Sequence, residues 1–357
     1  MDLITRKQSI SASQGVVTSN HPIASSVGIS ILSAGGNAFD AAIGTAFALS
    51  VVEPMMVGPF GGGFTNFFRP AEGFSTIDGY GSAPGAAHEK MYKPISNDLA
   101  QYFDVEDQLN QNGYLSVGTP ANLLAWTHLV EKYGNFNLNE VIQPSINIAR
   151  NGFRVTNYLS DIIKDNINEL SNYKESTNIY ISNGKAPQAG EIIKNPNYAL
   201  TLEGISKYGS AYLHEGELGK HIEDEMKKNG GLVTLNDLKR QKIFYREPIV
   251  GNYKGYKINS VGPVSSGGIC LIQMLNILEN FNIEKYNLFD PERIHIISEV
   301  FKIVFADRYR YIGDPEYVNI PISGLISKEY ALKRANEINL NKAQSYKFTN
   351  NFLDNDS

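Results

Sequence analysis

Apolar residues recur at three- and four-residue spacing through the middle of the chain, which is typical of helices with one buried face. This spacing predicts helices over residues 121–133, 138–151 and 158–170. Two earlier helices are expected over residues 23–33 and 38–52, separated by glycines that let the chain leave a helix in a left-handed conformation. The second of them is rich in small residues, so we expect it to be packed closely on all sides.

The pattern changes to that of β-strands in two places. Residues 64–68 and 74–79 form apolar and aromatic runs joined by a turn, and further β-like segments lie between residues 244 and 261. The stretch 171–197 is polar and rich in Asn, Gly and Pro, so it is predicted to be a surface loop. Further helices are expected over residues 198–208, 218–229, 269–281 and from 291 toward 310.

Composition places the chain among ordinary globular proteins, because 42% of its 357 residues are hydrophobic and 19% are charged. The formal charge of −5 argues against a nucleic-acid partner, since such proteins carry a basic stripe that neutralises phosphates. No apolar run approaches the roughly 18 residues of a membrane span, and residues 1–8 lack the apolar core of a secretory signal. We therefore expect no membrane partner and a cytoplasmic location, unless a leader has been removed.

Local motifs favour structural roles over chemistry. The glycines at 61–63 precede a strand and no Lys-Ser/Thr follows them, which favours a crowded strand entry over a phosphate loop. Ser265 and Ser266 precede the helix expected at 269–281, where a helix cap is favoured over a ligand contact. Asp307 and Arg308 lie on a predicted helix, where we expect an ordering ion pair.

Neither a metal nor a cofactor is expected. The six histidines are scattered singly, and the only cysteine, Cys270, lies in an apolar helix where a buried inert thiol is the default. No serine lies in a Gly-x-Ser-x-Gly turn. Spacing and chemistry alone therefore assemble no nucleophile, base and oxyanion site within this chain.

Blocks along almost the whole chain nevertheless resemble, in order, those of the γ-glutamyltranspeptidase (glutathione hydrolase) family. Examples are Asn20-His21-Pro22 and Gly118-Thr119-Pro120. The resemblance implies an N-terminal nucleophile hydrolase of α+β class, a four-layer α/β/β/α sandwich shared with a small subunit. The matching blocks are residues 20–22, 31–42, 51–54, 61–64, 118–120, 132–134, 143–144, 149–153, 229–234, 253–256, 263–268 and 306–308.

Members of that family are made as zymogens that cut themselves before a threonine, so the resemblance implies that this chain is the large subunit. Residues 1–342 would be its part of a single domain with no clean internal boundary, and residues 343–357 a flexible polar tail ending at the autocleavage site, Ser357. The partner would be a small subunit from the same precursor. The threonine that begins it would be the nucleophile, with no catalytic residue in this chain and its own α-amine as base. A dimer of heterodimers is left open.

The family's large subunit contributes an arginine that holds the substrate's α-carboxylate, in an Asp-x-Arg-Glu-x-Ala-Pro block. Here the matching residues 78–84 place Tyr80 at the arginine and Gly81 at the glutamate, and these two are the predicted substrate-binding residues. A tyrosine offers one neutral hydrogen bond where a guanidinium offers a charged fork. Arg69 is one alternative source of the charge.

Three functions follow from the resemblance. The first is cleavage of γ-glutamyl amides such as glutathione, favouring hydrolysis over transfer. The second is the same mechanism acting on a different amide, with an oxamate-like or other acyl group. The third is an inactive scaffold or solute-binding relative.

Overall fold

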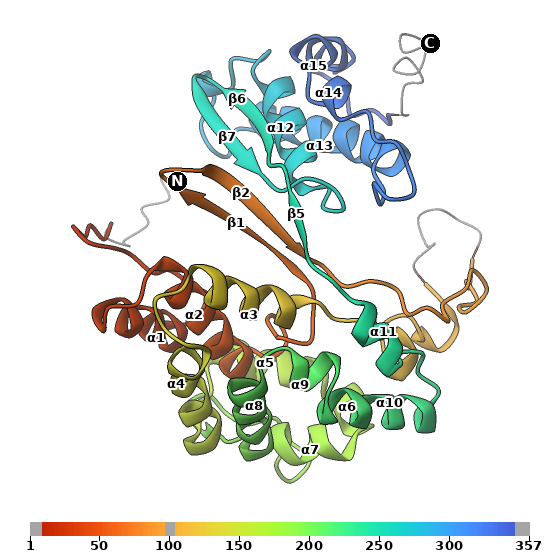
Figure 1. Ribbon diagram of the computed structural model, residues 1–357. Helices are drawn as coiled ribbons and strands as arrows, with labels where there is room; N and C mark the ends of the chain where they lie inside the picture. The colour runs from red at the N-terminus through yellow and green to blue at the C-terminus, as the bar shows by residue number, and fades with distance from the viewer. Residues whose placement is uncertain (1–8, 97–103, 347–357) are drawn as a thin grey trace. The chain divides into compact units, whose positions relative to one another are not determined.

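The computed structural model describes residues 9–96 and 104–346 (Figure 1). They divide into two compact units, one formed by residues up to Gly63 together with Gly79–Ile243, the other by Phe64–Asp78 and the chain from Phe244 onward. Each unit is therefore built from two separate stretches of the chain. The prediction that residues 1–342 belong to one domain shared with another chain stays a prediction, and Ser357 lies outside the described residues.

The first unit begins with a group of helices whose predicted positions are confirmed. They are α1 (Pro22–Ser33), α2 (Ala38–Val52), α3 (Asn122–Tyr133) and α4 (Leu138–Asn151). Helix α2 packs against the other three. Its small residues Ala41, Gly44 and Ala48 are buried, whereas Ala42 is exposed, so the expectation of close packing on all sides is wrong for that face. Its first turn is held by a capping box, in which Asn37 and Asp40 each accept a backbone N–H of the other.

Two local predictions in this unit are wrong. The helix expected over 158–170 is split into α5 (Asn157–Asp165) and α6 (Ile167–Ser171), because Asn166 leaves the helical conformation and donates its side-chain amide to the Ile162 carbonyl. The stretch expected to be loop contains α7 (Lys174–Tyr180) and β4 (Ile192–Ile193), which pairs antiparallel with β3 (Phe153–Arg154). Its polar composition hides a buried isoleucine, Ile193.

The remaining helices of this unit are short or half-exposed. They comprise α8 (Pro196–Tyr208), α9 (Ala211–His214), α10 (Glu217–Asn229) and α11 (Leu235–Arg240), with 3-10 turns η2 (Glu106–Gln108) and η3 (Tyr114–Ser116). Helix α8 packs against α4, and α9, α10 and α11 contact one another. The helices expected at 198–208 and 218–229 are thereby confirmed.

Two histidines of this unit are buried, His21 and His214. The Nδ1 atom of His21 accepts the N–H of Ile23 at 3.2 Å and caps α1, while Nδ1 of His214 lies 2.9 Å from the Leu238 carbonyl. Burial lowers the pKa of His21, with Glu53 opposing it, and burial likewise lowers the pKa of His214. Protonation of His21 would remove the lone pair on Nδ1 that caps α1. Protonation of either histidine would also place a positive charge in a buried position, which is unfavourable.

This burial predicts that stability falls on the acid side of neutrality. An unfolded histidine takes its proton near pH 6.5, whereas these two do so only at lower pH, so the unfolded state binds more protons below that value. We expect the free energy of unfolding to fall by up to about 1.4 kcal/mol per pH unit for each histidine. Thermal unfolding between pH 5 and 8 measures this slope.

Matched variants assign the slope to these two rings. His21→Asn keeps the capping acceptor and His214→Asn keeps a donor for Leu238, so the double variant should show a flatter pH dependence. His221→Gln alters an exposed ring and should leave the slope unchanged. A double variant as steep as the parent would contradict the assignment.

The second unit contains the predicted hairpin, formed by β1 (Gly63–Arg69) and β2 (Gly73–Gly79). Strand β5 (Phe244–Arg246) adds to it in the order β1-β2-β5, antiparallel to β2, with Thr76 opposite Arg246 and Asp78 opposite Phe244. The carboxylate of Asp78 is buried and accepts from Nε of Arg246 at 3.1 Å. Asp78, the first residue of the 78–84 block, therefore links β2 to β5 by an ion pair within the sheet.

A second hairpin and a group of helices complete this unit. The hairpin joins β6 (Ile249–Tyr253) to β7 (Tyr256–Ser260). It packs against α12 (Gly267–Leu278), which also packs against α13 (Pro291–Tyr311) and α15 (Lys328–Ala335). The remaining elements are η4 (Ile283–Lys285) and α14 (Ile322–Leu325).

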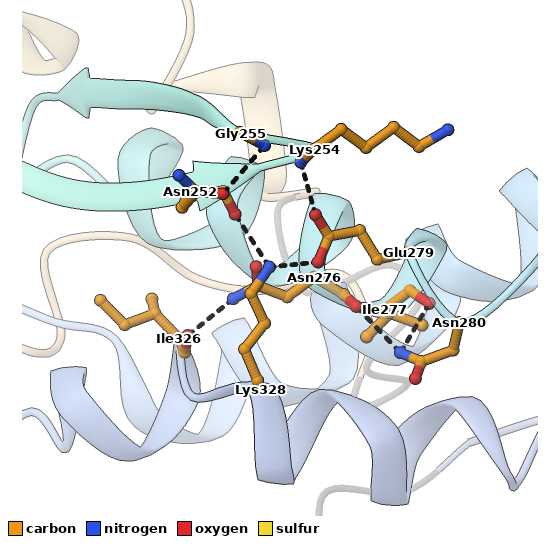
Figure 2. Close-up of polar contacts among 9 residues, drawn as sticks. All are labelled: Asn252, Lys254, Gly255, Asn276, Ile277, Glu279, Asn280, Ile326 and Lys328. Atoms are coloured by element: carbon orange, nitrogen blue, oxygen red, sulfur yellow. Dashed lines mark hydrogen bonds and ion pairs between the residues drawn. The ribbon is translucent and has the colours of Figure 1, made fainter.

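A polar network ties that hairpin to the helices (Figure 2). The carboxylate of Glu279, at the end of α12, accepts from the backbone N–H of Lys254 at 2.6 Å and from the ammonium of Lys328. Lys328 also donates to the Asn252 carbonyl at 2.8 Å, and Asn276 donates to the Ile326 carbonyl at 2.6 Å. One carboxylate thus fixes the 253–256 turn against the start of α15.

The polar predictions for this unit need correction. Asp307 pairs with Arg334 of α15 and not with Arg308, because consecutive residues on a helix do not face each other. Arg308 donates instead to the Ser266 hydroxyl at 2.9 Å, and the N–H of Gly267 at the start of α12 is capped by the Ser265 hydroxyl at 3.2 Å.

Cys270 is buried as predicted, and burial raises the pKa of its thiol. In the two described ranges no helix has both the length and the apolar character needed to cross a bilayer.

Candidate substrate-binding site

The predicted substrate-binding residues lie in a segment that leaves β2 within the first unit. Tyr80 is the first residue after the strand and has 55% of its surface exposed, whereas Gly81 is half-buried. Ser82 forms an antiparallel bridge with Thr119, in which each N–H donates to the other's carbonyl at 3.0 and 2.8 Å. The segment therefore presents the Tyr80 side chain from a backbone held on one side by residues 118–120.

Glycines allow this backbone to approach two other parts of the unit closely. A Cβ on Gly62 would lie 2.4 Å from the Gly81 nitrogen, and a Cβ on Gly81 would lie 2.8 Å from the Thr119 carbonyl. Side chains at either position would collide with backbone. The strand entry is thus crowded as predicted at Gly62 and Gly63, whereas a Cβ on Gly61 would make only ordinary contacts, and Gly62 lies against the predicted substrate-binding residues.

The same glycine loop also holds the start of α3. The carbonyl of Gly61 accepts the N–H groups of Ala121 and Asn122, both at 3.0 Å, and the Asn122 amide donates to the Gly58 carbonyl at 2.9 Å. The backbone of the loop is therefore committed on two sides, toward α3 and toward Tyr80.

Two residues that no sequence pattern indicates contact this segment. Gln241, which follows α11, donates to the Tyr80 carbonyl and accepts from the Ser82 hydroxyl, and Asp237 of α11 accepts the N–H of Gly85. They lie more than 150 residues away along the chain. No local periodicity or spacing signals a contact of that separation.

Arg69, the alternative source of positive charge, is occupied elsewhere. It is the last residue of β1, at the turn of the hairpin, and pairs with Glu72 at 2.5 Å, whereas Tyr80 follows the opposite end of β2. The side chain at the arginine position therefore offers a phenol and its ring. Within the part of the chain that the structure describes, no cluster of three or more His, Cys, Asp or Glu is placed to hold a metal.

Comparisons with known proteins agree with this architecture. The model of the family described as Gamma-glutamyltranspeptidase matches residues 24–355. The solved structure of Helicobacter pylori gamma-glutamyltranspeptidase has a TM-score of 0.88 and 33% identity, covering 94% of this chain and 95% of that chain. These findings confirm the α+β class and define the fold as that of the N-terminal nucleophile hydrolases.

The chain belongs to the γ-glutamyltranspeptidase family. It is 40% identical over 346 residues to the Acylase ACY 1 proenzyme of Pseudomonas sp. (strain SE83), covering 97% of this chain and 62% of that protein. It is 37% identical over 337 residues to the glutathione hydrolase proenzyme of Escherichia coli (strain K12), covering 94% and 57%. The chain therefore spans less than two thirds of the length of either relative.

Proposed function

We propose that this chain is the large-subunit part of an amide-cleaving enzyme whose nucleophile is the N-terminal threonine of a small subunit from the same precursor. Two observations support this proposal. The family match spans residues 24–355, and two relatives that extend well beyond the matched region are named proenzymes. The four-layer sandwich would be completed by that small subunit.

The proposed mechanism needs no side-chain base from this chain. The α-amine of the threonine takes the proton of its own hydroxyl, which attacks the substrate amide, releases the amine and forms an acyl-enzyme. Water or a second amine then takes the acyl group. During maturation the same hydroxyl would attack the peptide carbonyl before it, and hydrolysis of the resulting ester would free both ends.

We further propose that the preferred acyl group lacks an α-carboxylate. The observation that carries this proposal is Tyr80, which stands at the arginine position on a backbone bonded by Gln241 at Tyr80 and by Thr119 at Ser82. A neutral phenol binds a carboxylate more weakly than a guanidinium does, because it lacks both the charge and the second donor. The Pseudomonas relative is named an acylase and not a glutathione hydrolase.

Cleavage of γ-glutamyl amides is the second candidate, and similarity to the Escherichia coli glutathione hydrolase favours it. In that case the α-carboxylate would be held mainly by small-subunit groups, with the Tyr80 hydroxyl as one donor. The same precursor and nucleophile serve both candidates, so they differ only in the acyl group.

The test uses the whole precursor, produced with its small-subunit segment. The substrates are p-nitroanilides of γ-glutamate, glutarate and butyrate, which remove first the amino group and then the carboxylate. We expect kcat/KM for the butyryl compound to equal or exceed that for the γ-glutamyl compound. A preference of tenfold or more for γ-glutamyl would establish the second candidate.

A separate outcome would overturn both candidates. If no fragment with an N-terminal threonine appears on sequencing and no anilide is cleaved, the inactive scaffold becomes the better account. Partner sequencing and anilide cleavage are independent, so a cleaved but inactive protein would be distinguished from an uncleaved one.

A further inference from the structure

The side-chain amide of Gln241 contacts the segment that follows β2 on both sides of Gly81. Nε2 of Gln241 donates to the Tyr80 carbonyl at 3.2 Å, and its Oε1 accepts from the Ser82 hydroxyl at 2.8 Å. A primary amide has both a donor and an acceptor, so it can bind two neighbouring residues at once. The contact with Tyr80 is made to its backbone carbonyl, so it holds the main chain at the position that matches the family's arginine.

Gln241 extends from a short helix that is itself well anchored. Leu238 of α11 is fully buried, and its carbonyl lies 2.9 Å from Nδ1 of His214. At the other end of α11, the N–H of Leu235 donates to the Glu223 carboxylate of α10 at 3.2 Å. The amide is therefore presented by a fixed support, which is what precise positioning of a binding group requires.

Asp237 provides a second contact from the same helix. Its Oδ1 accepts the N–H of Gly85 at 2.9 Å, while Oδ2 accepts the N–H and hydroxyl of Thr234 at 2.9 and 2.6 Å. Partial burial acts to raise the pKa of Asp237, but these hydrogen bonds outweigh it and lower the pKa. The carboxylate is therefore charged at neutral pH, and its bonds to the segment are charge-assisted.

We propose that Gln241 is a positioning residue for acyl specificity: it fixes the peptide after Tyr80, so that the side chain at position 80 meets the acyl group in one orientation. This inference rests on the proposed function for its link to catalysis. Thr119 holds Ser82 by two backbone hydrogen bonds and Gly62 lies close against Gly81, and Gln241 adds the side-chain contact to the Tyr80 carbonyl. Asp237 anchors the segment further along, at Gly85.

The test compares Gln241→Leu with a matched control, Gln143→Leu, in the whole processed protein. Gln143 is an exposed glutamine whose amide donates to Asn147 of its own helix at 3.2 Å. Hydrogen exchange followed by mass spectrometry reports on the peptide containing residues 79–86, independently of activity. We expect hydrogen exchange of this peptide to become about fivefold faster or more in Gln241→Leu, because the substitution removes both hydrogen bonds to the segment while α11 stays intact. Exchange should stay unchanged in Gln143→Leu.

Kinetics then separate positioning from a general structural role. Gln241→Leu should raise KM for the preferred p-nitroanilide about fivefold or more while kcat changes less than twofold, since the nucleophile is not in this chain. The ratio of butyryl to γ-glutamyl cleavage should move toward one. The melting temperature should match that of Gln143→Leu.

Hydrogen exchange and kinetics of the Gln241→Leu variant can each overturn the proposal. Unchanged exchange at residues 79–86 would overturn the claim that Gln241 holds the segment, whatever the substrate proves to be. Faster exchange with unchanged KM and unchanged substrate ratio would show a structural contact without influence on specificity and would also overturn the proposal. Failure of the proposed function appears separately, as absence of anilide cleavage by the parent protein.

Discussion

Replacement of Arg334 by Met is expected to lower the free energy of unfolding by about 3–5 kcal/mol, because it leaves a buried carboxylate without its counter-charge. Arg334 and Asp307 are both fully buried, with Nη2 3.5 Å from Oδ1. The other carboxylate oxygen accepts from Gln273 at 2.7 Å and from the Tyr330 hydroxyl at 2.9 Å. The pair thus joins α12, α13 and α15.

The environment of Asp307 explains why the loss should be large. Burial raises the pKa of this carboxyl, and Arg334, Tyr330 and Gln273 act against that shift. Without Arg334 the protein must either keep an unpaired buried charge or take up a proton, and both reduce stability at neutral pH.

A double variant distinguishes this explanation from simple loss of packing. Asp307→Asn removes the charge but keeps partners for Gln273 and Tyr330, so Asp307→Asn with Arg334→Met should be more stable than Arg334→Met alone. Lys333→Met, an exposed change on the same helix, should alter stability by no more than about 0.5 kcal/mol. Denaturant unfolding of the whole protein measures all four proteins. A double variant no more stable than the single one would contradict the charge argument.

Tyr80→Arg is expected to raise kcat/KM for γ-glutamyl-p-nitroanilide about 10- to 100-fold. A hydrogen bond to a charged group contributes about 1.5–3 kcal/mol, and about 1.4 kcal/mol corresponds to a tenfold change in rate. The new side chain would start from a backbone already fixed by Gln241 and Thr119, so little ordering is needed. Cleavage of the butyryl compound, which has no α-carboxylate, should not improve.

Two further substitutions test the geometry of that gain. Tyr80→Lys supplies charge without the planar fork and should recover only part of it. Tyr80→Phe removes the hydroxyl and should lower γ-glutamyl cleavage if that hydroxyl is a donor to the carboxylate. Equal or lower γ-glutamyl activity in Tyr80→Arg would show that the rest of the pocket is shaped for another acyl group.

Local pattern predicted most elements because their signals are local. The two strands before and after the 70–73 turn, and the helices at 38–52 and 138–151, have periodicities or glycine stops that lie within the element. The stretch 171–197 failed because its average polarity outweighed one buried isoleucine, Ile193, whose burial depends on pairing with Phe153. The ion pair expected between Asp307 and Arg308 failed because helix geometry separates neighbours.

By itself, the sequence determined the family, through blocks that follow the family's order, and it located the departure at Tyr80 within one of them. Such blocks and their substitutions are properties of the linear chain. Tertiary structure alone decided that Gln241 donates to the Tyr80 carbonyl, that Gly62 lies close to Gly81 and that Arg334 pairs with Asp307. The first of these contacts joins residues 161 positions apart and the second joins residues about 20 apart, and a contact of that kind exists only once the path of the folded chain brings the two together.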